Sequence, residues 1–272
     1  AIEERLAEKP LAKTKKQPVP QNGEIRLDHV SFQYEAGVKA LDDVSLTIRP
    51  GTVTALVGES GGGKSTVANL IARFWDVSEG SVTVGGVDVR KLDYADLMKH
   101  ISIVFQDTNL FKMSVAENVA MYKPGASREE IMEVLRQAQC EDILEKLPNG
   151  VDSVIGARGV YLSGGEMQRI ALARAILKDA PIVLLDEATA FADAENEYLI
   201  QRALDILLHG KTVLMIAHRL QTIVHADQII VMQRGGIAEQ GTHEELMQRQ
   251  GVYAKMYHEY ENSVSWKIGG WA

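Results

Sequence analysis

One segment, Gly58–Ser65, constrains this 272-residue chain most strongly, because it fits the pattern G-x-x-x-x-G-K-[ST]. The apolar run Thr52–Val57 before it predicts a buried strand, and Lys64–Phe74 predicts a helix. Glycines let such a loop curl so that its N–H groups converge, and the helix N-terminus adds the positive end of its dipole. A glycine turn that precedes a helix by chance is the alternative, but the flanking strand and helix favour a cradle for nucleoside triphosphate.

The cradle assigns a role to each of its residues. Lys64 would hold the β and γ phosphates, and the hydroxyl of Ser65 would bind Mg²⁺. We expect the nucleotide to contact the other residues in and beside the loop, which are Gly58, Ser60, Gly61, Gly62, Gly63 and Thr66. Kinases, GTPases, helicases and transport ATPases share such a cradle, so residues elsewhere must separate these classes.

Strand and helix signals in the rest of the chain predict an α/β fold. Apolar runs at 182–185 and 213–217 are separated by a helical stretch near 194–208, a pattern typical of βαβ units in a parallel sheet. Alternating apolar residues from Glu24 onward predict that the domain begins with strands. Helical signals dominate from about 107 to 180, which predicts a helical subdomain inserted into the core.

Composition and charge exclude several other classes. Hydrophobic residues make up 46% and charged residues 24%, as in a folded soluble domain, and the net charge of −8 argues against nucleic acid as a partner. The single cysteine, Cys140, excludes an intrachain disulfide and a multi-cysteine zinc cluster, and it favours a reducing compartment. No apolar run approaches the ~20 residues that span a bilayer, so we expect cytosolic exposure.

The two ends of the chain differ from its centre. Prolines and lysines interrupt any periodicity after a short helical stub, so we interpret residues 1–22 as the end of an upstream helix and a linker. A disordered native terminus is the alternative. The folded domain is predicted over 23–260, with its helical subdomain at about 107–180, and the tail at 261–272 receives no interpretation.

Two acids, Asp186 and Glu187, end the apolar run that begins at Ile182. The carboxyl ends of parallel strands meet at one edge of a sheet, so we expect both acids beside the phosphate loop. Asp186 is suited to bind Mg²⁺, and Glu187 is suited to activate water. Acids often simply end strands, but the phosphate loop favours the catalytic interpretation.

A second glycine-containing segment, Leu162–Arg169, reads L-S-G-G-E-M-Q-R and opens a predicted helix. Ser163 can cap the helix, Gly164 and Gly165 permit close approach, and the free amides form a second anion site. The segment resembles the signature motif of ABC-type ATPases. The resemblance implies a P-loop NTPase fold: a RecA-like core with a mixed or parallel sheet, an N-terminal antiparallel β subdomain and an inserted α-helical subdomain. In that family, the signature completes the ATP pocket of a second such domain, and two domains pair head to tail around two ATP molecules.

Further matches in the same order extend this resemblance over nearly all of residues 24–250. Tyr34 resembles the aromatic residue that stacks on adenine, and Gln106 resembles the glutamine that touches Mg²⁺ and water and relays toward membrane domains. Asp193 occupies the position of an aspartate that helps two domains communicate. His218 resembles the histidine that contacts the γ-phosphate. The resemblance therefore implies ATP and Mg²⁺ as ligands, with Glu187, His218, Gln106 and Lys64 as the catalytic residues.

Three positions depart from the family pattern. Glu166 stands where the signature usually has glutamine, and a carboxylate near a phosphate site is unfavourable unless it points away. The run 190–192 reads A-F-A, which differs from the usual sequence before Asp193. Ala157 replaces the glutamate common in the coupling segment of exporter-fold transporters. Coupling between the two sites and to membrane helices is therefore the property most open to change.

These motifs predict an ATP-hydrolysing domain of an exporter-fold half-transporter, with its transmembrane domain upstream on the same full-length chain and its location at the cytoplasmic face of a membrane. Residues 188–195 resemble the siderophore-handling branch of such transporters, of the yersiniabactin-uptake type. The alternative is a soluble ABC ATPase that acts as a mechanical clamp. DNA-repair forms carry either a cysteine zinc module or a long coiled-coil insertion between the phosphate loop and the signature. The single cysteine excludes the first, and the short stretch of sequence between Lys64 and Ser163 excludes the second. A translation-type form stays open.

Overall fold

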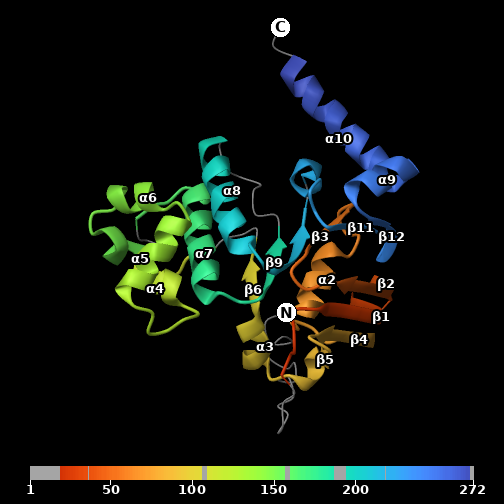
Figure 1. The fold of residues 1–272 in the computed structure, drawn as a ribbon, viewed down its shortest axis with the longest axis horizontal. Coiled ribbons are helices and arrows are strands. Elements are labelled where there is room, and N and C mark those ends of the chain that lie inside the picture. Colours follow the sequence, from red (N-terminus) through yellow and green to blue (C-terminus); the bar gives the residue numbers. More distant parts are fainter. Residues whose placement is uncertain are drawn as a thin grey trace.

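The structure is a computed structural model that describes residues 19–35, 37–105, 109–156, 160–186, 194–217 and 219–269, without the side chains of 194–195 and 263–269. The two main sheets lie side by side, and a helical region lies on the far side of the larger one (Figure 1). The predicted α/β fold with a mixed sheet and an N-terminal antiparallel part is confirmed. Most of the predicted upstream helix and linker lies outside the described residues.

The larger sheet has six strands in the order β12-β11-β3-β10-β9-β6. All neighbouring pairs are parallel except β11 with β12. Apolar cores cover both faces, so Ile182 and Leu184 of β9 pack into one core while Val183 and Leu185 pack into the other. The strands are β3 (Val53–Gly58), β6 (Ile101–Val104), β9 (Ile182–Asp186), β10 (Thr212–Ile216), β11 (Gln228–Gln233) and β12 (Gly236–Gly241).

The smaller sheet is antiparallel and has the order β2-β1-β4-β5. Its strands are β1 (Ile25–Glu35), β2 (Val38–Ile48), β4 (Glu79–Val84) and β5 (Val87–Asp88). Helix α2 (Lys64–Ile71) packs between the two sheets, because its Val67 and Leu70 share one apolar core with Ile25 of β1 and Leu56 of β3. This burial on both sides holds the start of α2 against the end of β3.

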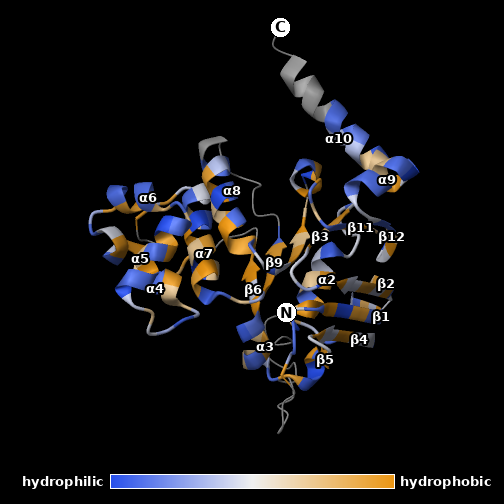
Figure 2. Cartoon of the chain, in the orientation of Figure 1, coloured by the Kyte–Doolittle hydropathy of each residue, from blue (hydrophilic) through white to orange (hydrophobic). Residues whose placement is uncertain are grey.

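The helical region follows β6 and centres on α7. Helix α7 packs against α4, α5 and α8, and apolar residues concentrate on the faces that these helices turn toward one another and toward the sheet (Figure 2). Serine caps begin α4, α5 and α7, each with a glutamate three residues later. The elements from β5 to β10 are η1 (Val89–Lys91), α3 (Tyr94–His100), β7 (Met113–Ser114), α4 (Val115–Ala120), α5 (Arg128–Gln137), α6 (Glu141–Lys146), η2 (Gly150–Asp152), β8 (Val154–Ile155), α7 (Gly164–Lys178) and α8 (Ala194–Leu208).

The C-terminal part of the chain is helical. The elements are η3 (Leu220–Ile223), α9 (His243–Arg249) and α10 (Val252–Gly269). Tyr253 and Ala254 anchor the beginning of α10, and the helix then projects away from the domain (Figure 1). The tail without interpretation is thus helical as far as Gly269. In the described part of the chain, no helix has both the length and the apolar character that crossing a membrane requires.

Candidate functional site

The loop between β3 and α2 requires glycine at two positions. Gly58 has a φ of 135°, and a Cβ there would lie 2.0 Å from the carbonyl oxygen of Met232. Gly63, the N-cap of α2, has a φ of 100°, and its Cβ would lie 2.6 Å from Cδ2 of Leu41. At Gly61, by contrast, a Cβ would meet nothing within 4 Å. The loop is therefore curled tightly against its own chain while its tip stays open, as a phosphate cradle requires.

The side chain of Lys64 folds back over this loop. Its ammonium donates hydrogen bonds of 2.8 Å to the carbonyl oxygens of Gly58 and Glu59, and the residue is 5% exposed. A nearly buried cation at the N-terminus of α2 concentrates positive potential at one point. Ser65 in the same helical turn is exposed, whereas Thr66 is buried. The residues that the sequence assigned to the phosphates therefore fit an anionic ligand.

The ring of Tyr34 stands beside α2. Its hydroxyl lies 3.4 Å from Oγ1 of Thr66 and accepts a hydrogen bond of 3.3 Å from Nδ2 of Asn69. Perpendicular contacts with Phe32 and Trp75 support the ring, yet the residue is 47% exposed. A fixed aromatic ring with free surface near the phosphate loop is suited to stack on a nucleotide base.

Asp186 ends β9 at the same edge of the sheet as the phosphate loop. It is in register with Ile216 of β10, which pairs with Leu56 of β3, two residues before the loop. Asp186 also lines a small cavity with Asn69 of α2. The hydroxyl of Ser65 and the carboxylate of Asp186 are oxygen donors of the kind that Mg²⁺ prefers, so the donor set fits this ion.

Four predicted site residues lie outside the described residues, namely Gln106, Glu187, Asp193 and His218. In the chain, Gln106 comes two positions after β6, Glu187 directly follows β9, and His218 comes two positions after β10. These three strands are parallel and end at the edge that carries the phosphate loop. The departures at 157 and 190–192 also lie outside the described residues.

The signature loop opens α7 with a reciprocal cap. Ser163 Oγ accepts a hydrogen bond of 3.3 Å from the amide of Glu166, and the Glu166 carboxylate accepts one of 2.8 Å from the amide of Ser163. A Cβ at Gly165 would lie 2.7 Å from Cγ of Asn196, so the fold itself requires that glycine. A Cβ at Gly164 would meet nothing within 4 Å. The chain by itself gives no steric reason for glycine at 164, and the helix N-terminus is open there.

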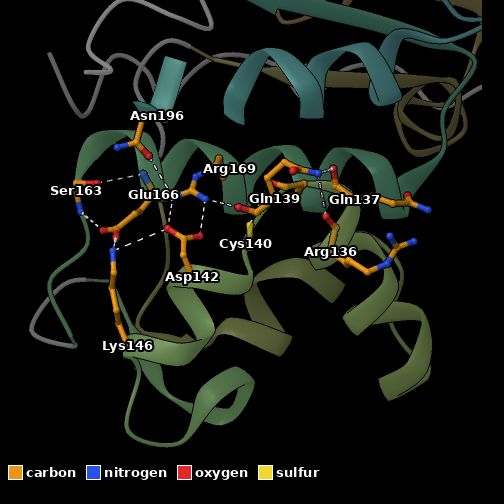
Figure 3. Close-up of polar contacts among 11 residues, drawn as sticks. Arg136, Gln137, Gln139, Cys140, Asp142, Lys146, Ser163, Glu166, Arg169 and Asn196 are labelled. Carbon is orange, nitrogen blue, oxygen red and sulfur yellow. Dashed lines mark hydrogen bonds and ion pairs between the residues drawn. The ribbon is translucent and has the colours of Figure 1, made fainter. Parts of the chain in front are cut away.

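The carboxylate of Glu166 is turned toward α6. Its Oε1 lies 3.1 Å from Nζ of Lys146, the last residue of that helix (Figure 3). Burial acts to raise the pKa of Glu166, but hydrogen bonds from Ser163 and Lys146 outweigh it and hold the pKa below its usual value. Sequence reasoning missed Lys146, because no motif marks it and only the packing of α6 on α7 brings the two residues together.

Beside this pair, a buried arginine ties the start of α7 to α6 and α8. Arg169, which is 1% exposed, donates to both carboxylate oxygens of Asp142 at 2.6 and 2.9 Å and to Oδ1 of Asn196 at 3.1 Å (Figure 3). It also donates to the carbonyl of Gln139. Its hydrogen bonds lower the pKa of Asp142. These contacts hold the signature loop in place.

We expect Asp142→Asn to lower the free energy of unfolding by about 2 kcal/mol at pH 7, because it leaves a buried guanidinium without its anion. The pKa of folded Asp142 is depressed, so its stabilisation is complete above the unfolded pKa of about 3.9 and is lost as the pH falls through the folded pKa. Urea unfolding at pH 7 and at acid pH measures both effects. Asp152→Asn is the matched control, because Asp152 makes the same two-point contact with Arg128 on the surface. Equal losses in both variants would contradict the argument.

Comparison with known proteins identifies the family. Residues 41–190, more than half of the chain, match the family described as ABC transporter. The chain belongs to the ABC transporter family. It is 53% identical over 235 residues to the mycobactin import ATP-binding/permease protein IrtA of Mycolicibacterium thermoresistibile, which covers 86% of this chain and 26% of that protein. It is 48% identical to an ATP-dependent lipid A-core flippase of Legionella pneumophila, over 86% of this chain and 40% of that protein.

A solved structure agrees with the sequence matches. A bacterial Atm1-family ABC exporter with ATP bound superposes with a TM-score of 0.87 at 37% identity, over 94% of this chain and 45% of that chain. The resemblance predicted from the motifs is therefore confirmed, and this ABC transporter chain is an ATP-hydrolysing domain with the fold of the corresponding domain in an ABC exporter. The chain spans about a quarter to two fifths of the length of its curated relatives.

Proposed function

We propose that this chain powers an exporter-fold half-transporter, and that two such domains associate head to tail around two ATP molecules. One observation carries the proposal: a single chain holds two sites suited to phosphate, the loop at Gly58–Ser65 and the loop at Ser163–Gly165. In the described part of the chain, the hydrogen bonds of Ser163 are local and none reaches the phosphate loop. A signature loop that does not serve its own nucleotide is available to close the nucleotide of a second domain.

Each site residue has one task in this arrangement. Lys64 and the loop amides bind the β and γ phosphates, while Tyr34 stacks on adenine. Mg²⁺, held by Ser65, Asp186 and Gln106, would neutralise charge on the transferred phosphoryl group. Glu187 accepts a proton from the attacking water, His218 contacts the γ-phosphate, and the partner's Ser163–Gly165 amides complete the cradle. Asp193 communicates between the two sites. The catalytic effect is mainly one of positioning and charge.

Gly164→Ala should leave the fold intact and impair the ATPase. Alanine is at least as favourable as glycine in a first helical turn, and apart from the neighbouring residues of the same helical turn no described atom lies within 4 Å of the added methyl group. The methyl group would fill the space that the partner's phosphate must enter, so we expect ATP hydrolysis to fall at least about tenfold. Phosphate release and sedimentation with MgATP measure the two consequences.

Gly165→Ala is the contrasting variant. Its methyl group would meet the side chain of Asn196 at 2.7 Å, so this variant should lose stability as well as activity. Gly164→Ala should unfold at the same urea concentration as the unsubstituted chain. Full turnover and full ATP-dependent association by a folded Gly164→Ala protein would overturn the proposed arrangement.

A groove lined by aromatic side chains favours a transmembrane domain as a partner. Exposed rings line an open space of about 590 Å³ between α3, the end of β6 and α7. The rings belong to Phe74, Tyr94, Phe105 and Tyr122. Phe105 directly precedes Gln106, the residue expected to relay toward membrane domains. We propose that a transmembrane domain of the same full-length protein docks in this groove, which puts the chain at the cytoplasmic face of a membrane.

Siderophores are the cargo that we propose. Three relatives at 51 to 53% identity are described as mycobactin import proteins. The resemblance of residues 188–195 to the siderophore-handling branch favours the same cargo. The lipid A-core flippases are nearly as similar, at 48% identity. ATPase activity of the full-length protein in lipid vesicles should therefore rise with an iron-loaded siderophore. Stimulation by lipid A alone would overturn the cargo proposal and leave the ATPase proposal intact.

A further inference from the structure

The acidic residue at the third position of α7 creates an electrostatic conflict. A capping box works with glutamate or glutamine at this position, so the helix does not need the charge. The positive end of α7 attracts the carboxylate of Glu166, and the same end would attract the partner's phosphate. An unbalanced Glu166 would therefore repel the ligand that the proposed function brings to this loop.

Lys146 supplies the missing balance. Its Nζ lies 3.1 Å from the carboxylate of Glu166 and 3.9 Å from that of Asp142, which in turn holds Arg169. The two acids and the two bases thus alternate in the order Glu166, Lys146, Asp142 and Arg169, and their formal charges sum to zero (Figure 3). The side chain of Lys146 is 66% exposed, whereas that of Glu166 is 13% exposed. Lys146 is the most exposed member of this row, so its charge can be removed without disturbing the packing around Arg169.

A purely structural role for such a pair has its own example in this chain. Ser127 caps α5 in a reciprocal box with Glu130, and Nζ of Lys123 lies 2.7 Å from the Glu130 carboxylate. This second pair repeats the geometry of Lys146 and Glu166 at a helix that the proposed function does not use. The pair of Lys123 and Glu130 therefore serves as a control. It shows how such a contact affects the stability of a capped helix where no phosphate is expected to bind.

We propose that Lys146 is a positioning residue of the ATPase, which neutralises Glu166 so that the signature loop can receive the phosphate of the partner-bound ATP. The inference rests on the proposed head-to-tail association. It explains how this chain uses an acidic signature residue at an anion site. The proposal differs from a purely structural role in one prediction. Lys146 should no longer be needed when Glu166 loses its charge.

The test is a double-mutant cycle on the 272-residue chain, with Lys146→Met, Glu166→Gln and the combined variant. Sedimentation equilibrium with Mg²⁺ and a non-hydrolysable ATP analogue gives the dimer affinity, and a fluorescent ATP analogue gives nucleotide affinity of the monomer. Lys146→Met should weaken association about fivefold at low salt, which corresponds to one unbalanced charge near the phosphate. The loss should shrink as salt is added. Nucleotide affinity of the monomer should not change.

The combined variant decides the question. Glu166→Gln together with Lys146→Met should return the dimer affinity to within about twofold of the unsubstituted chain. Lys146→Arg, which conserves the charge, should retain the dimer affinity of the unsubstituted chain. Lys123→Met, the matched control, should leave association unchanged. Persistent loss in the combined variant, or an equal loss from Lys123→Met, would show that the contact is only structural. If the unsubstituted chain does not associate with the analogue, the proposed function fails, and this inference fails with it.

Discussion

Lys64→Ala should reduce ATP affinity of the monomer about 30- to 100-fold. The Lys64 ammonium is nearly buried and lies at the N-terminus of α2, so its charge acts on a phosphate with little screening by water. Loss of a charge-assisted contact of this kind costs about 2–3 kcal/mol of binding free energy. Isothermal titration with MgATP measures the change directly.

Lys211→Ala is the control for this prediction. Lys211 is also largely buried and paired, with Asp179, but it precedes β10 and so lies at the opposite edge of the sheet from the phosphate loop. That variant should bind ATP normally. Lys64→Ala also removes two hydrogen bonds to loop carbonyls, so its urea unfolding must be measured alongside. Unchanged ATP affinity in a folded Lys64→Ala protein would contradict the cradle.

Glu187→Gln should lower steady-state phosphate release at least about 100-fold while ATP stays bound. Glutamine has nearly the same shape but cannot accept the proton of the attacking water. Because ATP is then not consumed, the head-to-tail dimer should accumulate, and sedimentation with MgATP should show it. Turnover at the original rate would refute the assignment of Glu187 as the base.

Asp186→Asn provides the comparison for Glu187→Gln. Asp186 lies at the edge of β9 and is proposed to hold Mg²⁺, so its loss should weaken the dependence of ATP binding on Mg²⁺. Glu187→Gln should leave that dependence unchanged. Two neighbouring acids with different defects would separate metal binding from proton transfer, whereas identical defects would contradict the division of roles.

Local patterns predicted the phosphate loop and the main strands. The loop is set by eight consecutive residues, and the glycines that the motif demands at 58 and 63 adopt positive φ values in the structure. Runs of apolar residues predicted β3, β9 and β10, because strands covered on both faces are apolar at nearly every position. The capping pattern likewise predicted the start of α7.

Elements whose sequence lacks a regular hydrophobic period were not predicted. Helix α10 mixes aromatic, charged and small residues, and its beginning is stabilised by Tyr253 packing into a core with β11 and α9. A helix whose stability comes from such contacts carries a weak signal of its own. For the same reason, the sequence alone raised the problem of Glu166 but did not identify the residue that answers it.

The sequence by itself determined the family, the nucleotide and the residue types at each phosphate site, because backbone curvature and charge in these loops depend on consecutive residues. Only the tertiary structure decided which separate segments meet: Tyr34 with α2, Asp186 beside the loop, Arg169 with Asp142, and Lys146 with Glu166. Such pairs form because the packing of apolar faces places polar groups from distant parts of the sequence next to one another. Their charges follow from the sequence, but their proximity follows from the burial of other residues.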